Sequence, residues 1–146
     1  MKIYIAGPDV FEKNAKEIGE KYKVICSAYG HTGLYPLDNE CNSSAEIYQG
    51  NVALIDSADA VVANGNNFRG EMDVGTAFEV GYAAAKGKKI LIYMDDTRTL
   101  VEKYGTEDEK GRFVEDFGHP LNLMLAESAE IIKGSFEDCM KKLNTV

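Results

Sequence analysis

One continuous stretch of the sequence, from Asp59 to Lys88, combines residue types that can perform chemistry: DAVVANGNNFRGEMDVGTAFEVGYAAAKGK. An apolar run typical of a buried strand leads into a polar loop, and a helix rich in small residues is expected to begin near Gly75. Glu79 then falls in or near the first helical turn, where the positive end of the helix dipole favours an ionised carboxylate. A carboxylate that stays ionised at the rim of a cleft can act as a nucleophile.

The same segment also has structural interpretations that the sequence leaves open. The residues TAFE, from Thr76 to Glu79, have the pattern of a helix capping box. Asp73 lies six residues before Glu79, which on one continuous helix would turn it about 240° away. Asp73 can therefore share a site with Glu79 only from the loop before the helix, where it would also suit an N-cap. Arg69 and Glu71 can form a surface ion pair.

Short β-like runs alternate with helical stretches along the chain, which predicts a single α/β domain over residues 1–146. We expect a five-stranded, mainly parallel sheet of flavodoxin-like (Rossmann-like) order with helices on both faces. Asp9 suits the N-cap of the first helix, and the segment 95–118 has the polar composition of a loop. The expected strands span residues 2–6, 34–36, 60–64, 89–94 and 130–133, and the expected helices 10–28, 43–56, 75–86, 121–126 and 136–143.

In such sheets, ligands bind beyond the carboxyl ends of the strands, near the point where the strand order reverses. Three loops leave these ends early in the chain: residues 7–11, 37–42 and 64–75. Gly7 and Phe11 bound the first of these loops and are candidates for substrate binding. Tyr4 alternates with two isoleucines in the first strand, as expected of a core or cleft aromatic with its hydroxyl at a polar rim.

Composition and charge exclude several classes of partner. The formal net charge of −8 over 146 residues argues against nucleic-acid polymers and anionic membrane surfaces. No run of about 18 apolar residues predicts a membrane span, and the opening MKIYIAGPD resembles a strand more than a secretory signal. The three cysteines are odd in number and widely spaced, which is typical of neither a disulfide framework nor a metal site and predicts a cytoplasmic protein.

Cofactor motifs have no support in this sequence. There is no GxxxxGK[ST] loop and no GxGxxG after a strand, so neither ATP nor a dinucleotide is indicated. His31 and His119 are isolated, so no zinc site is predicted and no cysteine is tied to a histidine as in a Cys–His hydrolase. We therefore expect chemistry that needs neither a metal nor an organic cofactor.

Four segments together resemble the nucleoside 2-deoxyribosyltransferase family: KIYIAGPDVF, ADAVVAN, FRGEMDVGTAFEVGYAAAKGK and LNLML. They span the chain from Lys2 to about Leu125, and the long central block is the most specific of them. The resemblance implies a small flavodoxin-like domain that forms homo-oligomers, with each site completed by a neighbouring subunit. It also implies small-molecule substrates, namely 2′-deoxynucleosides and free nucleobases.

The resemblance assigns roles to individual residues. Glu79 matches the family's nucleophile, and Asp73 matches an acid that contacts the base and handles its proton. Asp59 matches a second base-side acid, and Tyr4 an aromatic that positions the nucleophile. Asn122 in LNLML resembles the residue that the adjacent subunit lends to the 5′-hydroxyl of the sugar.

The implied mechanism is a retaining double displacement, in which Glu79 attacks C1′ of a 2′-deoxynucleoside and an acceptor base then displaces Glu79, as in retaining glycosidases. The choice between purine and pyrimidine bases stays open. One alternative is a hydrolase of 2′-deoxynucleoside 5′-monophosphates, in which Arg69, a further substrate-binding candidate, would meet the phosphate. Another is a non-catalytic nucleotide-binding module on the same fold.

Overall fold

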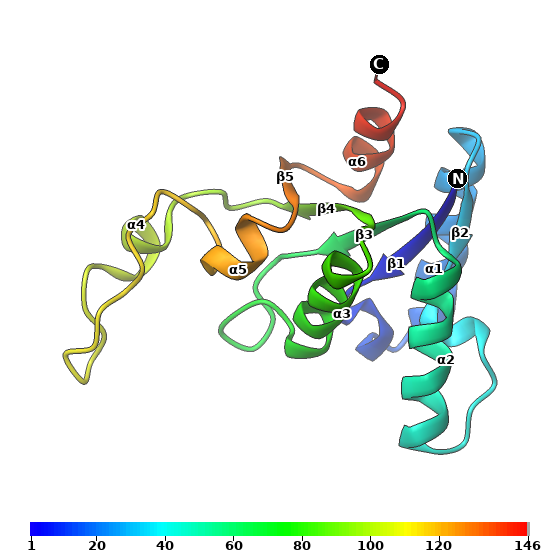
Figure 1. The fold of residues 1–146 in the computed structure, drawn as a ribbon, viewed down its shortest axis with the longest axis horizontal. Helices are drawn as coiled ribbons and strands as arrows, with labels where there is room; N and C mark the ends of the chain where they lie inside the picture. Colours follow the sequence, from blue (N-terminus) through cyan, green and yellow to red (C-terminus); the bar gives the residue numbers. More distant parts are fainter. Residues whose placement is uncertain (146) are drawn as a thin grey trace.

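The computed structural model describes residues 1–145, which form one five-stranded sheet with helices on both faces (Figure 1). All neighbouring strands are parallel, and their order is β2-β1-β3-β4-β5. This is the predicted flavodoxin-like order. The strands are β1 (Lys2–Ala6), β2 (Thr32–Leu34), β3 (Ala60–Asn64), β4 (Lys89–Met94) and β5 (Glu130–Lys133).

Alternate residues of the central strands enter two separate cores, because successive side chains of a strand point to opposite faces. Tyr4, Val61 and Ile92 pack on the face covered by α2 (Ser44–Ser57), α3 (Val74–Ala85) and α5 (Leu123–Ala126). The opposite face, which includes Ile5, Val62 and Leu91, is covered by α1 (Ala15–Ala28) and α6 (Phe136–Leu143). The two cores contribute a set of fully buried β-branched and aromatic side chains that holds β1 and β3 rigidly at the centre of the sheet.

The connection between β1 and α1 differs from the prediction. A 3₁₀ helix, η1 (Pro8–Phe11), follows β1, and α1 begins only at Ala15, with Asn14 as its N-cap residue. The predicted N-cap role of Asp9 is therefore wrong. Its carboxylate instead accepts hydrogen bonds from the Tyr22 hydroxyl and the Asn64 amide, both at 3.3 Å, because Pro8 starts a separate helical turn that places Asp9 over the sheet.

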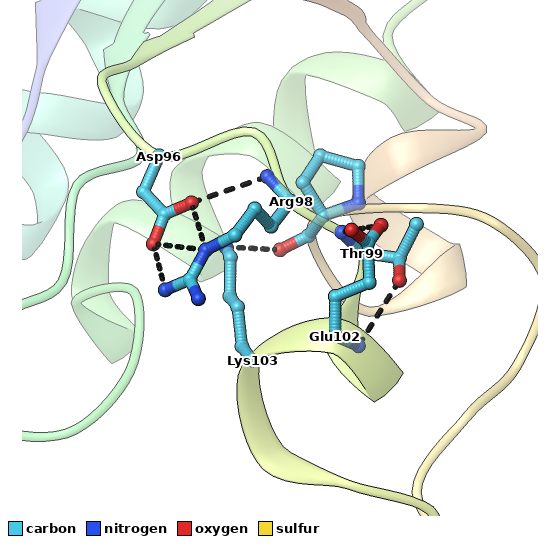
Figure 2. A network of polar contacts seen from close by, with 6 residues as sticks. Asp96, Arg98, Thr99, Glu102 and Lys103 are labelled. Carbon is cyan, nitrogen blue, oxygen red and sulfur yellow. Dashed lines mark hydrogen bonds and ion pairs between the residues drawn. The ribbon is translucent and has the colours of Figure 1, made fainter.

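The predicted loop 95–118 also holds more structure than expected. Residues 95–120, here called the arm, contain α4 (Leu100–Tyr104) and a β-bridge between Glu107 and Phe113, and they extend away from the sheet (Figure 1). The polar contacts at the base of the arm are drawn in Figure 2: Arg98 pairs with Asp96 at 2.7 Å, and Lys103 donates to the Pro120 carbonyl at 3.0 Å. The contact of Lys103 with Pro120 ties the two ends of the arm together, so the arm leaves the domain as a folded unit.

Candidate active site

The centre of the site is a direct contact between Tyr4 and Glu79. Tyr4 is fully buried on β1 and faces α3, and its hydroxyl donates a hydrogen bond to Oε2 of Glu79. Glu79 is half-buried and belongs to the second turn of α3, which begins at Val74. The fold thus brings together two predicted residues that stand 75 positions apart in the sequence.

Burial controls the charge of Glu79. It raises the pKa of the carboxyl from 4.5 to about 7, because removal from water disfavours the ionised form. The hydrogen bond from Tyr4 lowers this pKa, and the nearby charge of Asp73 raises it. The expectation that the helix dipole keeps Glu79 ionised is wrong: Glu79 lies beyond the first turn, where the dipole effect is small, and desolvation is the larger contribution.

Asp73 is the N-cap residue of α3. Its Oδ2 accepts hydrogen bonds from the Thr76 backbone N–H at 2.9 Å and from the Thr76 hydroxyl at 2.7 Å. Asp73 therefore lies before the helix, as it must if it shares a site with Glu79. The capping box predicted from Thr76 to Glu79 is wrong, since Thr76 is inside the helix and almost fully buried. Among the described residues, Oδ1 of Asp73 accepts no hydrogen bond.

Gly7 allows the ends of β1 and β3 to approach each other. A Cβ atom at this position would lie 2.9 Å from Cβ of Asn64 and 2.7 Å from Oδ2 of Asp9. Such contacts are closer than real Cβ atoms show, so a side chain at Gly7 would push the two loops apart. Close packing therefore explains why a glycine stands at position 7. A role of Gly7 in substrate binding stays a prediction.

Phe11 and Arg69 meet in a small stack that also contains Phe68. The Phe11 and Phe68 rings lie 5.5 Å apart with an interplanar angle of 12°, and the Arg69 guanidinium lies 4.4 Å from the Phe68 ring centre. The predicted ion pair of Arg69 with Glu71 does not form: no ion pair of Arg69 occurs within residues 1–145. Phe68 was missed by the sequence analysis, although its place in a polar turn beside Arg69 was a usable signal.

Asp59 does not belong to this site. It stands immediately before β3 and is exposed, and its Oδ2 accepts a hydrogen bond from the backbone N–H of Lys2 at 2.7 Å. Both residues lie at the amino ends of the parallel strands β1 and β3. The loops that lead to η1 and α3 leave from the opposite, carboxyl ends of these strands. The predicted base-side role of Asp59 is therefore wrong, because a parallel sheet separates the starts of its strands from their ends.

Asn122 is placed away from Glu79 of its own chain. It is the N-cap residue of α5, with Nδ2 donating to Glu115 at 2.7 Å. It lines an open cavity of about 1250 Å³ between α3, α5 and the arm, to which α3 contributes Ala77 and Gly81. Glu79 lies on the opposite side of α3 from these two residues, since consecutive helical residues are about 100° apart. This cavity is therefore not the place where Glu79 would meet a substrate, although it is large.

Two buried amides were also missed. Nδ2 of Asn39 and Oδ1 of Asn51 are buried and have no hydrogen-bond partner among the described residues. Asn51 is one turn before Ile55 on α2, and Ile55 packs in the same core as Tyr4. Asn39 follows the 3₁₀ helix Pro36–Asp38 after β2. A Cβ atom at Gly50 would lie 2.8 Å from its amide nitrogen. Unpaired buried polar groups are costly, but both atoms are closed to solvent and neither residue lines a cavity that also holds Asn122 or Tyr93.

Comparison with known proteins identifies the family. Residues 3–124 match the model of the family described as nucleoside 2-deoxyribosyltransferase. The chain belongs to the nucleoside 2-deoxyribosyltransferase family. This confirms the family predicted from the sequence.

Solved structures of similar proteins have the same fold. A 2-desoxiribosyltransferase from Leishmania mexicana is 40% identical, with a TM-score of 0.89 over 97% of this chain and 95% of that one. A 2-deoxyribosyltransferase from Bacillus psychrosaccharolyticus is 20% identical, with a TM-score of 0.63 over 100% and 93%. A CMP N-glycosidase from Clostridium botulinum is 17% identical, with a TM-score of 0.54 over 99% and 98%. The last two likenesses show the fold alone.

A relative from Schizosaccharomyces pombe, the uncharacterized protein C191.05c, is 34% identical over 112 residues, which are 69% of this chain. The chain spans about half the length of this relative, 53%. Within residues 1–145, no helix is long and apolar enough to cross a membrane, and no group of three or more His, Cys, Asp or Glu side chains is placed to hold a metal ion.

Proposed function

We propose that this protein transfers 2-deoxyribose between nucleobases by a retaining double displacement through a covalent bond to Glu79. The observation that carries the proposal is the part-buried Tyr4–Glu79 hydrogen bond between β1 and α3. It fixes one carboxylate oxygen, Oε2, and leaves Oε1 to attack a sugar carbon. A nucleophile held by a neighbouring donor in a partly desolvated place is a typical arrangement for covalent catalysis.

The reaction has two balanced steps. In the first, an oxygen of Glu79 forms a bond to C1′ while the C1′–N bond breaks, and the bonding electron pair leaves with the base. The transition state has oxocarbenium character, and the attack inverts C1′. In the second, a nitrogen of the acceptor base attacks C1′ and the carboxylate of Glu79 leaves, so the second inversion restores the original configuration.

Tyr4 is a positioning residue in this mechanism. Its own pKa is raised by burial and by the adjacent charge of Glu79, so the hydroxyl keeps its proton and remains a donor. The hydrogen bond partly offsets the cost of ionising Glu79 in a buried place. It therefore keeps a usable fraction of the nucleophile charged near neutral pH.

In this proposal, Asp73 handles the proton of the base. Its Oδ2 is occupied by the two hydrogen bonds from Thr76, which fix the side chain at the start of α3. Oδ1 remains free to face a substrate, in donor or acceptor form.

The arrangement also supports a homo-oligomer whose sites are shared. Asn122 and Glu79 lie on opposite sides of α3, so an Asn122 that binds the 5′-hydroxyl must come from a neighbouring chain. Large apolar side chains are exposed around these elements and would be covered by such a neighbour: Ile47, Tyr48, Val74, Phe78 and Met124.

Chromatography of the protein incubated with 2′-deoxyinosine and free adenine tests the proposal. We expect 2′-deoxyadenosine to form with the wild-type chain and not with Glu79→Ala, and a deoxyribosyl adduct on Glu79 to be detectable by mass spectrometry without an acceptor. Release of adenine from dAMP with no transfer would favour the nucleotide hydrolase instead. No turnover with either substrate, or with thymidine as donor, would leave a binding module.

A further inference from the structure

The turn between β3 and α3 holds an arginine in an unfavourable backbone conformation. Phe68 and Glu71 close the turn through a bond from Phe68 N–H to the Glu71 carbonyl at 2.7 Å, and the two central residues have positive φ: 56° for Arg69 and 101° for Gly70. Turns of this kind prefer Asn-Gly, because asparagine tolerates positive φ better than a long side chain does. Strain of this kind is common where a side chain serves a ligand.

The side chain of Arg69 has no polar partner in the described part of the chain. The hydrogen bonds and ion pairs of residues 1–145 include none from its guanidinium, which instead lies over the rings of Phe68 and Phe11, at 4.4 and 5.4 Å. Stacking on two rings fixes the plane of the guanidinium while its N–H donors stay free at the edge. Phe11 is 59% exposed, so part of its side chain remains open to a ligand.

This stack lies at the carboxyl edge of the two central strands. Phe11 ends the loop after β1, the strand that carries Tyr4, and Phe68 and Arg69 lie in the loop after β3 that leads to Asp73. Ligands of flavodoxin-like sheets bind at this edge. The stack is therefore on the side of the site from which a base bonded to C1′ would project.

The local chemistry favours a nucleobase over a phosphate as the ligand of Arg69. Two backbone amides of the turn are already used, since Gly70 N–H donates to Oδ1 of Asn67 at 3.0 Å and Phe68 N–H donates to the Glu71 carbonyl at 2.7 Å. A phosphate would need a group of free amides around it, and the neighbouring carboxylates of Glu71 and Asp73 would repel a dianion. A flat, neutral base can stack on Phe11 and meet the donors of Arg69 edge-on.

We propose that Arg69 is a specificity-determining residue that binds O6 and N7 of a 6-oxopurine, such as hypoxanthine or guanine. The forked donors of arginine match these two acceptors, whereas the 6-amino group of adenine is itself a donor and the pyrimidines lack this edge. As the C1′–N9 bond breaks, the electron pair passes to the purine, and hydrogen bonds to O6 and N7 stabilise the developing negative charge. No proton leaves Arg69. The inference rests on the deoxyribosyl transfer proposed above.

The test compares Arg69→Asn and Arg69→Lys with the wild-type chain in single-turnover release of base from 2′-deoxyinosine, 2′-deoxyadenosine and thymidine. Arg69→Asn suits the positive φ of the turn, so its melting temperature should equal or exceed that of the wild type. We expect it to lose about 10- to 100-fold with 2′-deoxyinosine and less than about threefold with the other donors. Arg69→Lys keeps the charge without the forked donors and should lose nearly as much.

Equilibrium binding of free bases gives a readout that does not need turnover. Calorimetry should show hypoxanthine binding more tightly than adenine and 7-deazahypoxanthine, which lacks N7, and Arg69→Asn should remove both differences. Equal losses with all three donors, or a lower melting temperature, would overturn the role of Arg69. Failure of the transfer reaction itself would appear instead as a wild-type chain that binds hypoxanthine selectively but releases no base from any donor.

Discussion

The two sides of α3 have opposite chemical characters. One side carries Glu79, which is pressed against Tyr4 of β1 and has its pKa raised to about 7 by burial. The other carries Ala77 and Gly81, which line an open cavity, and a Cβ at Gly81 would meet no atom within 4 Å. The first side is complete within one chain, whereas the second lacks a partner. In the proposed function, this helix joins the nucleophile to a surface that a second copy of the chain would cover.

The largest expected effect comes from removing the proposed nucleophile on the side of α3 that carries Glu79, here called the closed side. Glu79→Gln keeps the size of the side chain and the hydrogen bond from Tyr4 but cannot form the ester to C1′. We expect deoxyribosyl transfer to fall by at least about a thousandfold with little change in fold. The measurement is the rate of base exchange, with circular dichroism as the control, and residual activity within tenfold of wild type would contradict the assignment.

The side of α3 that carries Ala77 and Gly81 is here called the open side. Mixing two inactive variants tests whether a neighbouring chain that binds there contributes its Asn122 to the site of Glu79. Asn122→Ser keeps an N-cap for α5 but loses the amide, so we expect its homo-oligomer to be nearly inactive. After subunit exchange with Glu79→Gln, about half of the pairs contain one chain of each variant, and one of the two sites in such a pair has both native residues. About a quarter of the wild-type activity should therefore return. If the mixture stays as inactive as its components, Asn122 does not act across subunits.

Filling the open side should disrupt assembly without unfolding the chain. Gly81→Leu adds a side chain where a single chain has free space and also raises helix propensity. We expect the mass in solution, measured by light scattering, to fall to that of a smaller species, and activity to fall about tenfold because shared sites are lost. Gly81→Ala is the matched control, with a smaller effect; an unchanged mass for Gly81→Leu would mean that this face is not an interface.

The pH dependence reports on the closed side. Because Glu79 must be ionised to attack, kcat/KM should rise with pH through an acidic limb near 7, its folded-state pKa. Tyr4→Phe removes the hydrogen bond that lowers this pKa and should move the limb to higher pH. Asp73→Asn removes a charge that raises it, while keeping a good N-cap, and should move the limb to lower pH. Shifts in the same direction would refute this electrostatic account.

The stability of Glu79→Gln should depend on pH in a defined direction. A carboxyl whose pKa is raised on folding stabilises the fold below its unfolded-state value, 4.5, and loses this contribution as the pH rises through about 7. The variant should therefore match the wild type near pH 4 and exceed it by up to about 3 kcal/mol above pH 8. Urea unfolding at both pH values measures the difference, and an equal gain at both would show that ionisation is not its cause.

The sequence by itself determined the local elements and the family. The strands at 60–64, 89–94 and 130–133 and the helix at 136–143 have the predicted bounds, because their apolar runs and the turn residues around them are adjacent in the chain. The order of the sheet followed from the alternation of these elements. Glu79 and Tyr4 were identified as candidate site residues from short motifs, which can be recognised in the sequence without the tertiary structure.

Only the tertiary structure decided how these residues act. Asp59 is near the central motif in sequence, yet its place at the start of a parallel strand puts it at the wrong edge of the sheet. The charge state of Glu79 depends on burial against Tyr4, and the stacking of Arg69 on Phe11 depends on two loops that meet in space. Burial, strand polarity and contacts between distant loops are properties of the packed chain, so no local pattern of residues could have predicted them.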